Sequence, residues 1–119
     1  MILNFQTIQH LNLSHNWIGM QGLEHLKDHF KSFQCLRVLM LSSNKLFLMD
    51  DRRTECLRDM LIDVSGTLEE LYLAENSMEP EDFECLIPAW IRMPRLKLLN
   101  LNVNRVWGPS LRKFLDLYL

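Results

Sequence analysis

Two histidines, His25 and His29, come nearest to a chemical site, because they lie four positions apart with Glu24 and Asp28 beside them. On a helix this spacing puts both rings on one face, where they can bind a metal ion. That face lies opposite the apolar side of the same helix, so both rings are expected in solvent and outside any pocket. We interpret the pair as part of a solvated helix surface and predict no metal site.

The sequence contains three cysteines, Cys35, Cys56 and Cys85. None has a histidine or another base nearby, so we interpret them as core or half-buried packing residues rather than nucleophiles. Their odd number and wide separation argue against a disulfide framework and favour a reducing compartment. Residues 1–8 are too short and too polar for a signal peptide. These features predict an intracellular, cytoplasmic protein, with a cytoskeletal or nuclear location also open.

Other signatures of catalysis and of charged ligands are missing from the sequence. It has no glycine-rich phosphate loop, no nucleophile with its base and no plausible acid pair. The 13 basic and 15 acidic side chains give a net charge of −2, without a long run of either sign. A nucleic-acid or membrane-surface site needs a concentrated basic patch, and no apolar stretch reaches transmembrane length. We therefore predict a protein that is not an enzyme and uses no cofactor.

A nine-residue block with the pattern aliphatic-x-x-Leu-x-Leu-x-x-Asn occurs four times, at residues 8–16, 36–44, 68–76 and 96–104. The Leu-x-Leu pair alternates with period two, which points both leucines to one side of a short strand. One such strand cannot bury its own apolar side, so the units must stack. The connecting segments are long enough for helices, so neighbouring strands are predicted to run parallel.

The block ends on the same polar residue in every copy: Asn16, Asn44, Asn76 and Asn104. A polar side chain in a buried column is costly unless it is paired. The asparagine amide has two donors and one acceptor, which can bond the backbone groups left free where each strand ends. We predict a structural ladder of asparagines running from repeat to repeat.

The connecting segments predict helices. The first is expected over about 23–33, after a turn with two glycines at 17–22, and the second is expected to follow a cap at Asp50-Asp51 and to end at Gly66. A third should begin at Pro80 and be kinked or ended near Leu86 by Pro88. The apolar face of the second helix is predicted to consist of Leu57, Met60, Leu61 and Val64. A fourth helix is predicted after Pro109, with an apolar face of Leu111, Phe114, Leu115 and Tyr118.

These blocks and their spacing resemble the leucine-rich repeats of the ribonuclease-inhibitor class, and the resemblance covers about residues 8–118. It implies an α/β solenoid with four parallel strands on the concave face and helices on the convex face. It also implies binding of a protein through the concave sheet or its rims. The ladder position departs from the inhibitor's pattern, in which asparagine alternates with cysteine. On this basis residues 1–119 form one domain, with repeats of about 8–35, 36–67, 68–95 and 96–119.

The candidate binding surface consists of the strand residues that point away from the leucines. We predict that Val38, Met40, Tyr72 and Leu98 form one contiguous apolar patch on the concave face, since strands lie about 4.8 Å apart. Such residues suit the centre of an interface ringed by polar groups. The alternative is that valine and tyrosine simply favour strands. The whole predicted surface is His10, Asn12, Val38, Met40, Glu70, Tyr72, Leu98 and Asn100.

Two other functions remain open. The chain is expected to be a fragment of a longer protein or to have its apolar ends covered in an assembly, so it could be a structural subunit stacked by those ends in a large complex. Some repeat proteins of this class regulate GTPases, for which Arg105 is the basic residue to consider. Trp17 and Trp107 are predicted to cover the turns or, if exposed, to anchor a partner. Arg52-Arg53 in the irregular loop offers a further contact.

Overall fold

The computed structural model describes residues 5–48, 54–106, 112 and 116. Several predicted features therefore lie outside the described residues: the cap at Asp50-Asp51, the pair Arg52-Arg53, Trp107 and Pro109. The apolar stripe of the fourth predicted helix, at Leu111, Phe114, Leu115 and Tyr118, lies outside them as well.

The structure confirms the prediction of four parallel strands in one sheet, in the order β1-β2-β3-β4. The strands are β1 (His10–Asn12), β2 (Val38–Met40), β3 (Glu70–Tyr72) and β4 (Leu98–Asn100). They fall at the same place in each block, and the pairing keeps equivalent residues side by side. Backbone bonds continue past each strand, since Leu13, Leu41 and Leu73 donate their N–H groups to the following repeat at 2.8, 2.9 and 2.8 Å.

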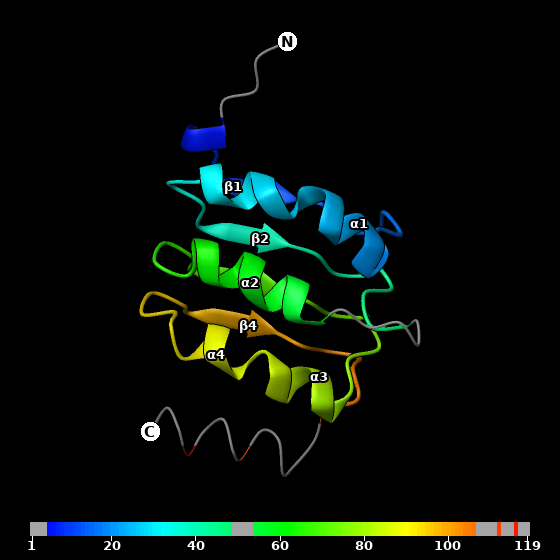
Figure 1. The fold of residues 1–119 in the computed structure, drawn as a ribbon. Helices are drawn as coiled ribbons and strands as arrows, with labels where there is room; N and C mark the ends of the chain where they lie inside the picture. The colour runs from blue at the N-terminus through cyan, green and yellow to red at the C-terminus, as the bar shows by residue number, and fades with distance from the viewer. Residues whose placement is uncertain (1–4, 49–53, 107–111, 113–115, 117–119) are drawn as a thin grey trace.

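The helices form a layer on one side of the sheet (Figure 1). They are α1 (Gly19–Leu26), α2 (Thr54–Val64), α3 (Pro80–Cys85) and α4 (Ile87–Trp90), with two 3-10 segments, η1 (Phe5–Thr7) and η2 (Lys27–Ser32). The leucines of the blocks point into this layer, where Leu39, Leu41, Leu71 and Leu73 are fully buried. None of the described helices has the length and apolarity needed to cross a membrane.

The first helix differs from the prediction at both ends. It begins at Gly19, whose φ of +62° favours glycine, and it changes to the 3-10 segment η2 at Lys27. Gly22 lies inside the helix rather than in a turn, and it packs closely there, since a Cβ would come within 2.5 Å of the Ile18 side chain. Gly19 thus allows the backbone conformation at the helix start, and Gly22 allows the close packing of Ile18. The presence of two glycines in the sequence does not distinguish these roles.

The later helices follow the prolines. Pro80 occupies the first turn of α3, whose capping box joins Glu79 and Asp82. The predicted break near Leu86 is confirmed, since this residue separates α3 from α4. The predicted end of the second helix is confirmed, since α2 ends at Val64 and Gly66 occupies the C′ position, although without the positive φ common for a glycine there. Instead, the N–H groups of Thr67 and Leu68 both donate to the Val64 carbonyl, at 3.3 and 3.2 Å.

Candidate functional site

The open face is the side of the sheet that the helices leave uncovered, and it carries the eight predicted surface residues. The register aligns them in two columns, one of His10, Val38, Glu70 and Leu98, the other of Asn12, Met40, Tyr72 and Asn100. His10, Asn12 and Leu98 are exposed, and the other five are half-buried. On the opposite face Leu39 and Leu71 are fully buried, so the two faces differ sharply in their access to solvent.

A carboxylate interrupts the apolar part of the open face. Met40 lies beside Tyr72 in the register, but Glu70 stands between Val38 and Leu98. The Tyr72 hydroxyl donates to Glu70 Oε1 at 2.6 Å, and this bond raises the pKa of Tyr72 above its ordinary value. The neighbouring apolar residues are thus Val38, Met40 and Tyr72, with Leu98 set apart across Glu70. The face combines a small apolar area with a hydrogen-bonding centre.

The two outer asparagines of the open face have local structural bonds. Asn12 Oδ1 accepts the N–H of Ser14 at 3.0 Å, and Asn100 Oδ1 accepts that of Asn102 at 3.0 Å. Each bond closes a short turn just after its strand. Both side chains still present their amide N–H groups at the edge of the face.

The ladder asparagines bond backbone groups of their own repeat and of the preceding one. Asn76 Oδ1 accepts the N–H groups of Asn44 and Leu46 at 2.8 and 3.3 Å, and its Nδ2 donates to Leu41 and Leu73 carbonyls at 3.0 and 3.1 Å. Asn44 and Asn104 make equivalent bonds to the repeats before them. Asn16 has no described repeat before it and bonds its own turn.

The turns around the ladder use left-handed backbone on both sides of the asparagine. The residue before it has φ of 61°, 57°, 56° and 56° in the four repeats, at His15, Ser43, Glu75 and Val103. Among the residues after it, Trp17, Lys45 and Ser77 also have positive φ. Of the two alternatives for Trp17, the exposed one applies, because this residue is 74% exposed. Lys45 Nζ lies 3.2 Å from the centre of the Trp17 ring in a cation–π contact.

A row of residues that was not predicted from the sequence lies directly before the strands: Gln9, Arg37, Glu69 and Lys97. Strict alternation would put Arg37 on the same side as the buried Leu39, but Arg37 is exposed. Two successive N–H groups, those of Arg37 and Val38, share the Gln9 carbonyl at 2.8 and 3.0 Å, and the same sharing recurs at β3 and β4. This bulge-like entry re-aims the side chain before each strand.

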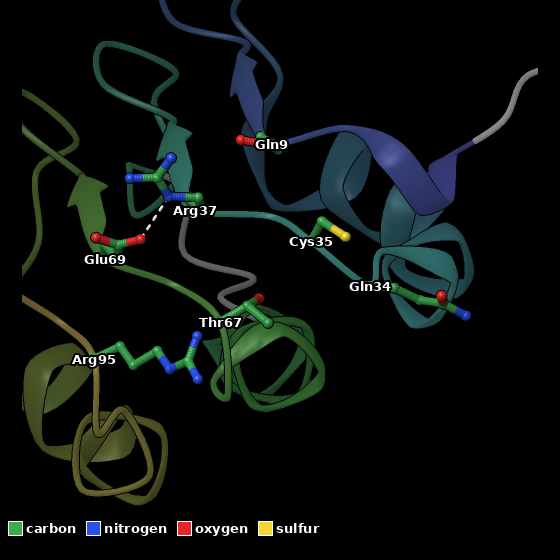
Figure 2. Close-up of a pocket in the computed structure, with 7 residues that line it drawn as sticks. All are labelled: Gln9, Gln34, Cys35, Arg37, Thr67, Glu69 and Arg95. Atoms are coloured by element: carbon green, nitrogen blue, oxygen red, sulfur yellow. Dashed lines mark hydrogen bonds and ion pairs between the residues drawn. The ribbon is translucent and has the colours of Figure 1, made fainter.

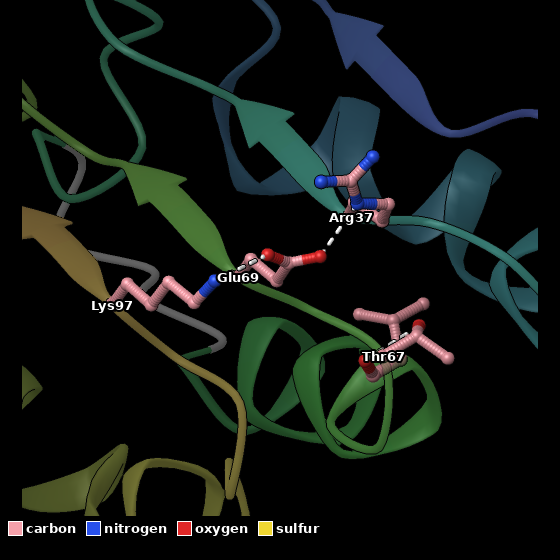
Figure 3. Close-up of polar contacts among 5 residues, drawn as sticks. Arg37, Thr67, Glu69 and Lys97 are labelled. Atoms are coloured by element: carbon pink, nitrogen blue, oxygen red, sulfur yellow. Dashed lines mark hydrogen bonds and ion pairs between the residues drawn. The ribbon is translucent and has the colours of Figure 1, made fainter.

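Three members of this row form an ion cluster, which we call the entry cluster (Figure 3). Arg37 Nε lies 2.5 Å from Glu69 Oε2, and Lys97 Nζ lies 3.1 Å from Glu69 Oε1. The hydrogen bonds from Arg37 and Lys97 lower the pKa of Glu69 to about 2, and the bond to Glu69 raises that of Arg37. A signal was present in the sequence, since the row reads positive, negative, positive at equivalent block positions.

Two cavities open beside the entry cluster. One, of about 300 Å³, is lined by Gln9, Gln34, Cys35, Arg37, Thr67, Glu69 and Arg95 (Figure 2). The second, of about 470 Å³, is lined by Glu69, Pro94, Arg95, Leu96 and Lys97. Glu69 and Arg95 therefore border both cavities. The prediction that all three cysteines are packing residues is wrong for Cys35, which is exposed and lines the first cavity.

The remaining candidates are the histidine pair, the two less exposed cysteines and Arg105. His25 and His29 are exposed, but the helix gives way to η2 between them, and the described residues contain no group of three potential metal ligands. Burial raises the pKa of both the Cys56 and the Cys85 thiol. Arg105, considered for GTPase regulation, lies 3.2 Å from the Glu79 carboxylate.

Comparison with known proteins supports one relationship. The family model described as Leucine Rich Repeat matches residues 7–31, which include β1, α1 and most of η2. No match was found among curated proteins or among solved structures. The family match supports a leucine-rich repeat protein, and this motif is typical of modules that bind other proteins.

Proposed function

We propose that the chain is a leucine-rich repeat domain of the ribonuclease-inhibitor type, which binds a protein partner through the open face of its sheet. In this proposal residues 1–119 form one solenoid with repeats of about 8–35, 36–67, 68–95 and 96–119, and the open face is concave. The family match to residues 7–31 and the four parallel strands with helices on one side support it. Three free cysteines favour an intracellular, cytoplasmic location.

The observation that carries the proposal is the pair Met40 and Tyr72 on the uncovered face. They are neighbours in the register and half-buried, although none of the described helices lies over them. Methionine and tyrosine are enriched in the buried parts of interfaces, where their side chains give a large contact area. The hydrogen bond from Tyr72 to Glu70 holds the phenol against the sheet, so less side-chain freedom is lost on binding.

Polar residues surround this pair, as is typical of a binding surface. His10 and Asn12 lie on the β1 side and Asn100 on the β4 side. A polar rim excludes water from the central contacts and supplies hydrogen bonds that select the partner. The proposed contact surface is therefore the pair Met40 and Tyr72 with Val38, Glu70 and these polar residues around it.

Affinity capture from a cell extract tests the proposal. The double variant Met40→Asp/Tyr72→Asp places two carboxylates on the open face without touching the buried leucines, so the fold should remain, which circular dichroism checks. Loss of interface anchors of this kind costs about 2 kcal/mol or more, or at least a tenfold loss of affinity. Ile91→Asp is the matched control, because Ile91 is 48% exposed and lies at the end of α4, in the helix layer.

We expect the same partner to be captured by the wild type and by Ile91→Asp, and to be lost with the double variant. Capture of an unchanged set of partners by the double variant would show that the open face is not the binding surface. Loss of partners with all variants alike would have the same meaning, since the control changes a distant surface.

A structural role in a larger complex has one observation in its favour. An apolar cavity of about 410 Å³ lies at the β1 end of the molecule, lined by Phe5, Leu11, Leu13, Leu26, His29, Phe30 and Phe33. Stacking on another repeat unit would cover these side chains. Light scattering over a range of concentrations separates the two functions. Self-association would favour the structural role, and a monomer at all concentrations would count against it.

A further inference from the structure

Arg95 is a cation without a partner in the described part of the chain. It lies between α4 and β4, it is exposed, and it makes no hydrogen bond or ion pair there. In Figure 2 its guanidinium extends toward Thr67 across the cavity that Arg37 and Glu69 border. A guanidinium carries five N–H donors in a fixed plane and binds carboxylates through two parallel bonds. The cavity therefore contains a set of unused donors.

Arg37 also lines this cavity and adds positive charge, with its terminal nitrogens turned away from Arg95 (Figure 2). It uses Nε to bond Glu69, and its two terminal nitrogens point away from that carboxylate (Figure 3). Glu69 is fully engaged by Arg37 and Lys97, so it fixes the position of both cations. The two cavities are thus bordered by three cations and one carboxylate that is already paired. The Glu70 carboxylate also acts on Arg37, but it accepts the Tyr72 hydroxyl on the open face.

The side chains around the two cavities carry a net positive charge, because Arg37, Arg95 and Lys97 outnumber the single Glu69 carboxylate, so the cavities suit an anionic group. Nucleic acid is disfavoured, because its binding needs many phosphate contacts and this chain has a net charge of −2. A cavity of about 300 Å³ fits one or two side chains rather than a large ligand.

From these observations we infer that the cavities beside the entry cluster form a second contact site, which binds aspartate or glutamate side chains of an acidic segment in the protein partner. Arg95 binds the carboxylates, and Arg37 and Lys97, which border the same cavities, add long-range attraction. The site rests on the proposed function and extends it, because Arg37 directly precedes Val38 of the open face. A partner that covers Met40 and Tyr72 can therefore extend an acidic segment onto this edge of the sheet.

Nuclear magnetic resonance of the full ¹⁵N-labelled chain tests the site. The probe is a capped hexapeptide of glutamate, and the matched peptide is the glutamine hexapeptide. We expect the glutamate peptide to shift the backbone amides of Cys35, Thr67 and Arg95, which line the cavity, and the glutamine peptide to leave them unchanged. Arg95→Gln should weaken binding about threefold or more, in the range of an exposed charge pair, without disturbing the fold.

Arg92→Gln is the matched control. Arg92 is an exposed arginine three residues earlier, and its Nη1 bonds the Pro88 carbonyl away from the cavities. Its loss should leave the affinity for the glutamate peptide unchanged. Equal weakening by both variants would indicate general attraction to a basic surface and overturn the inference. Two other results would also overturn it: no shift of the three amides, or a shift with inorganic phosphate alone.

The exposed thiol gives a second measurement. Cys35 is exposed and lines the cavity, whereas Cys56 is buried and Cys85 half-buried. The glutamate peptide should slow alkylation of Cys35, located by mass spectrometry, and leave that of Cys85 unchanged. An unchanged rate at Cys35 would contradict occupation of the cavity.

The two proposals can fail separately. If Arg95→Gln still captures the partner that Met40→Asp/Tyr72→Asp loses, and the peptide does not bind, the open face is the site and the acidic segment is wrong. If the peptide binds through Arg95 and the open-face variant still captures the partner, the site for the acidic segment is right and the open face is not the binding surface.

Discussion

The two inner repeats and the two outer ones contain the same nine-residue block but give it different surroundings. Leu39 and Leu71 in the inner repeats are fully buried, whereas Leu11 and Leu99 in the outer repeats are half-buried. The block thus sets where strands and turns form, while the neighbours on either side determine how much each leucine is buried. Stability in such an array is approximately a sum of contributions from each unit and from each contact between units.

The hydrogen bonds of the ladder distinguish the first repeat from the others, since Asn104 of the fourth repeat also bonds the repeat before it. Asn44 and Asn76 have no exposed surface, and each accepts two N–H groups of the repeat before it. Asn16 is exposed, and its Nδ2 donates only to carbonyls of its own turn, those of Leu13 and Ser14. An inner asparagine therefore joins two repeats, and the first one closes a single turn.

Substitution of the ladder asparagines should give the largest effect, as a difference between an inner repeat and the first one. In Asn76→Ala the buried N–H groups of Asn44 and Leu46 lose their acceptor. Each unsatisfied buried group costs about 1–3 kcal/mol, so we expect a loss of about 3 kcal/mol in the free energy of unfolding. Asn16→Ala should cost about 1 kcal/mol or less, because water replaces its exposed bonds. Urea denaturation measures both values.

Similar losses for the two variants would contradict the view that the ladder acts between repeats. Asn44→Ala is a further check, since Asn44 makes the same kind of bonds as Asn76 but to part-buried groups, so its loss should lie between those of Asn76→Ala and Asn16→Ala.

The regular parts of the fold could be predicted from the sequence because period and spacing determine them. The alternation of leucines predicts the strands and their direction, and the prolines Pro80 and Pro88 predict where α3 begins and ends. The features that were missed are deviations from that regularity. Shared carbonyls at the strand entries change the direction of Arg37 and its equivalents. Gly22, which was predicted in a turn, lies in a helix and packs closely against Ile18.

The candidate site was predictable only in part for the same reason. Alternation identifies which residues share the open face, including Met40 and Tyr72, but it gives no account of the bond between Tyr72 and Glu70. The entry cluster could not be predicted because it depends on the bulge-like entry of each strand. Arg95 could not be predicted because it lies outside the repeated block. Contacts between segments that lie outside a repeat cannot be found by comparing its copies.

The residue before the ladder asparagine offers a test with a smaller expected effect. It has nearly the same positive φ in all four repeats, but its type differs from repeat to repeat. Val103 in the fourth repeat has φ of 56° and is 76% exposed. A β-branched residue is strained in this conformation, at a cost of about 1–2 kcal/mol, whereas asparagine and histidine adopt it more readily. Val103→Asn should therefore raise the free energy of unfolding by about 1 kcal/mol.

His15→Asn in the first repeat is the control for that variant, because His15 has φ of 61° and already tolerates the conformation. Thermal denaturation should detect a change of less than about 0.5 kcal/mol there. A gain of the same size at both positions would show that the benefit comes from asparagine itself rather than from relief of strain at valine.

The smallest effect should come from the entry cluster, which joins an inner repeat to its neighbours on both sides. The pKa of Glu69 is lowered to about 2, so this carboxylate contributes stability that is fully present above pH 4.5, its ordinary value, and is lost as the pH falls through 2. Wild type and Glu69→Gln should therefore differ in their free energy of unfolding at neutral pH and converge toward pH 2.

Arg37→Gln tests the cause of the lowered pKa, because it removes the hydrogen bond that lowers this pKa most. Carboxyl titration by nuclear magnetic resonance should show the pKa of Glu69 moving back toward its ordinary value. A difference between wild type and Glu69→Gln that stays constant from pH 7 to about pH 2 would mean that Glu69 acts through packing, and the cluster would then not couple the repeats by charge.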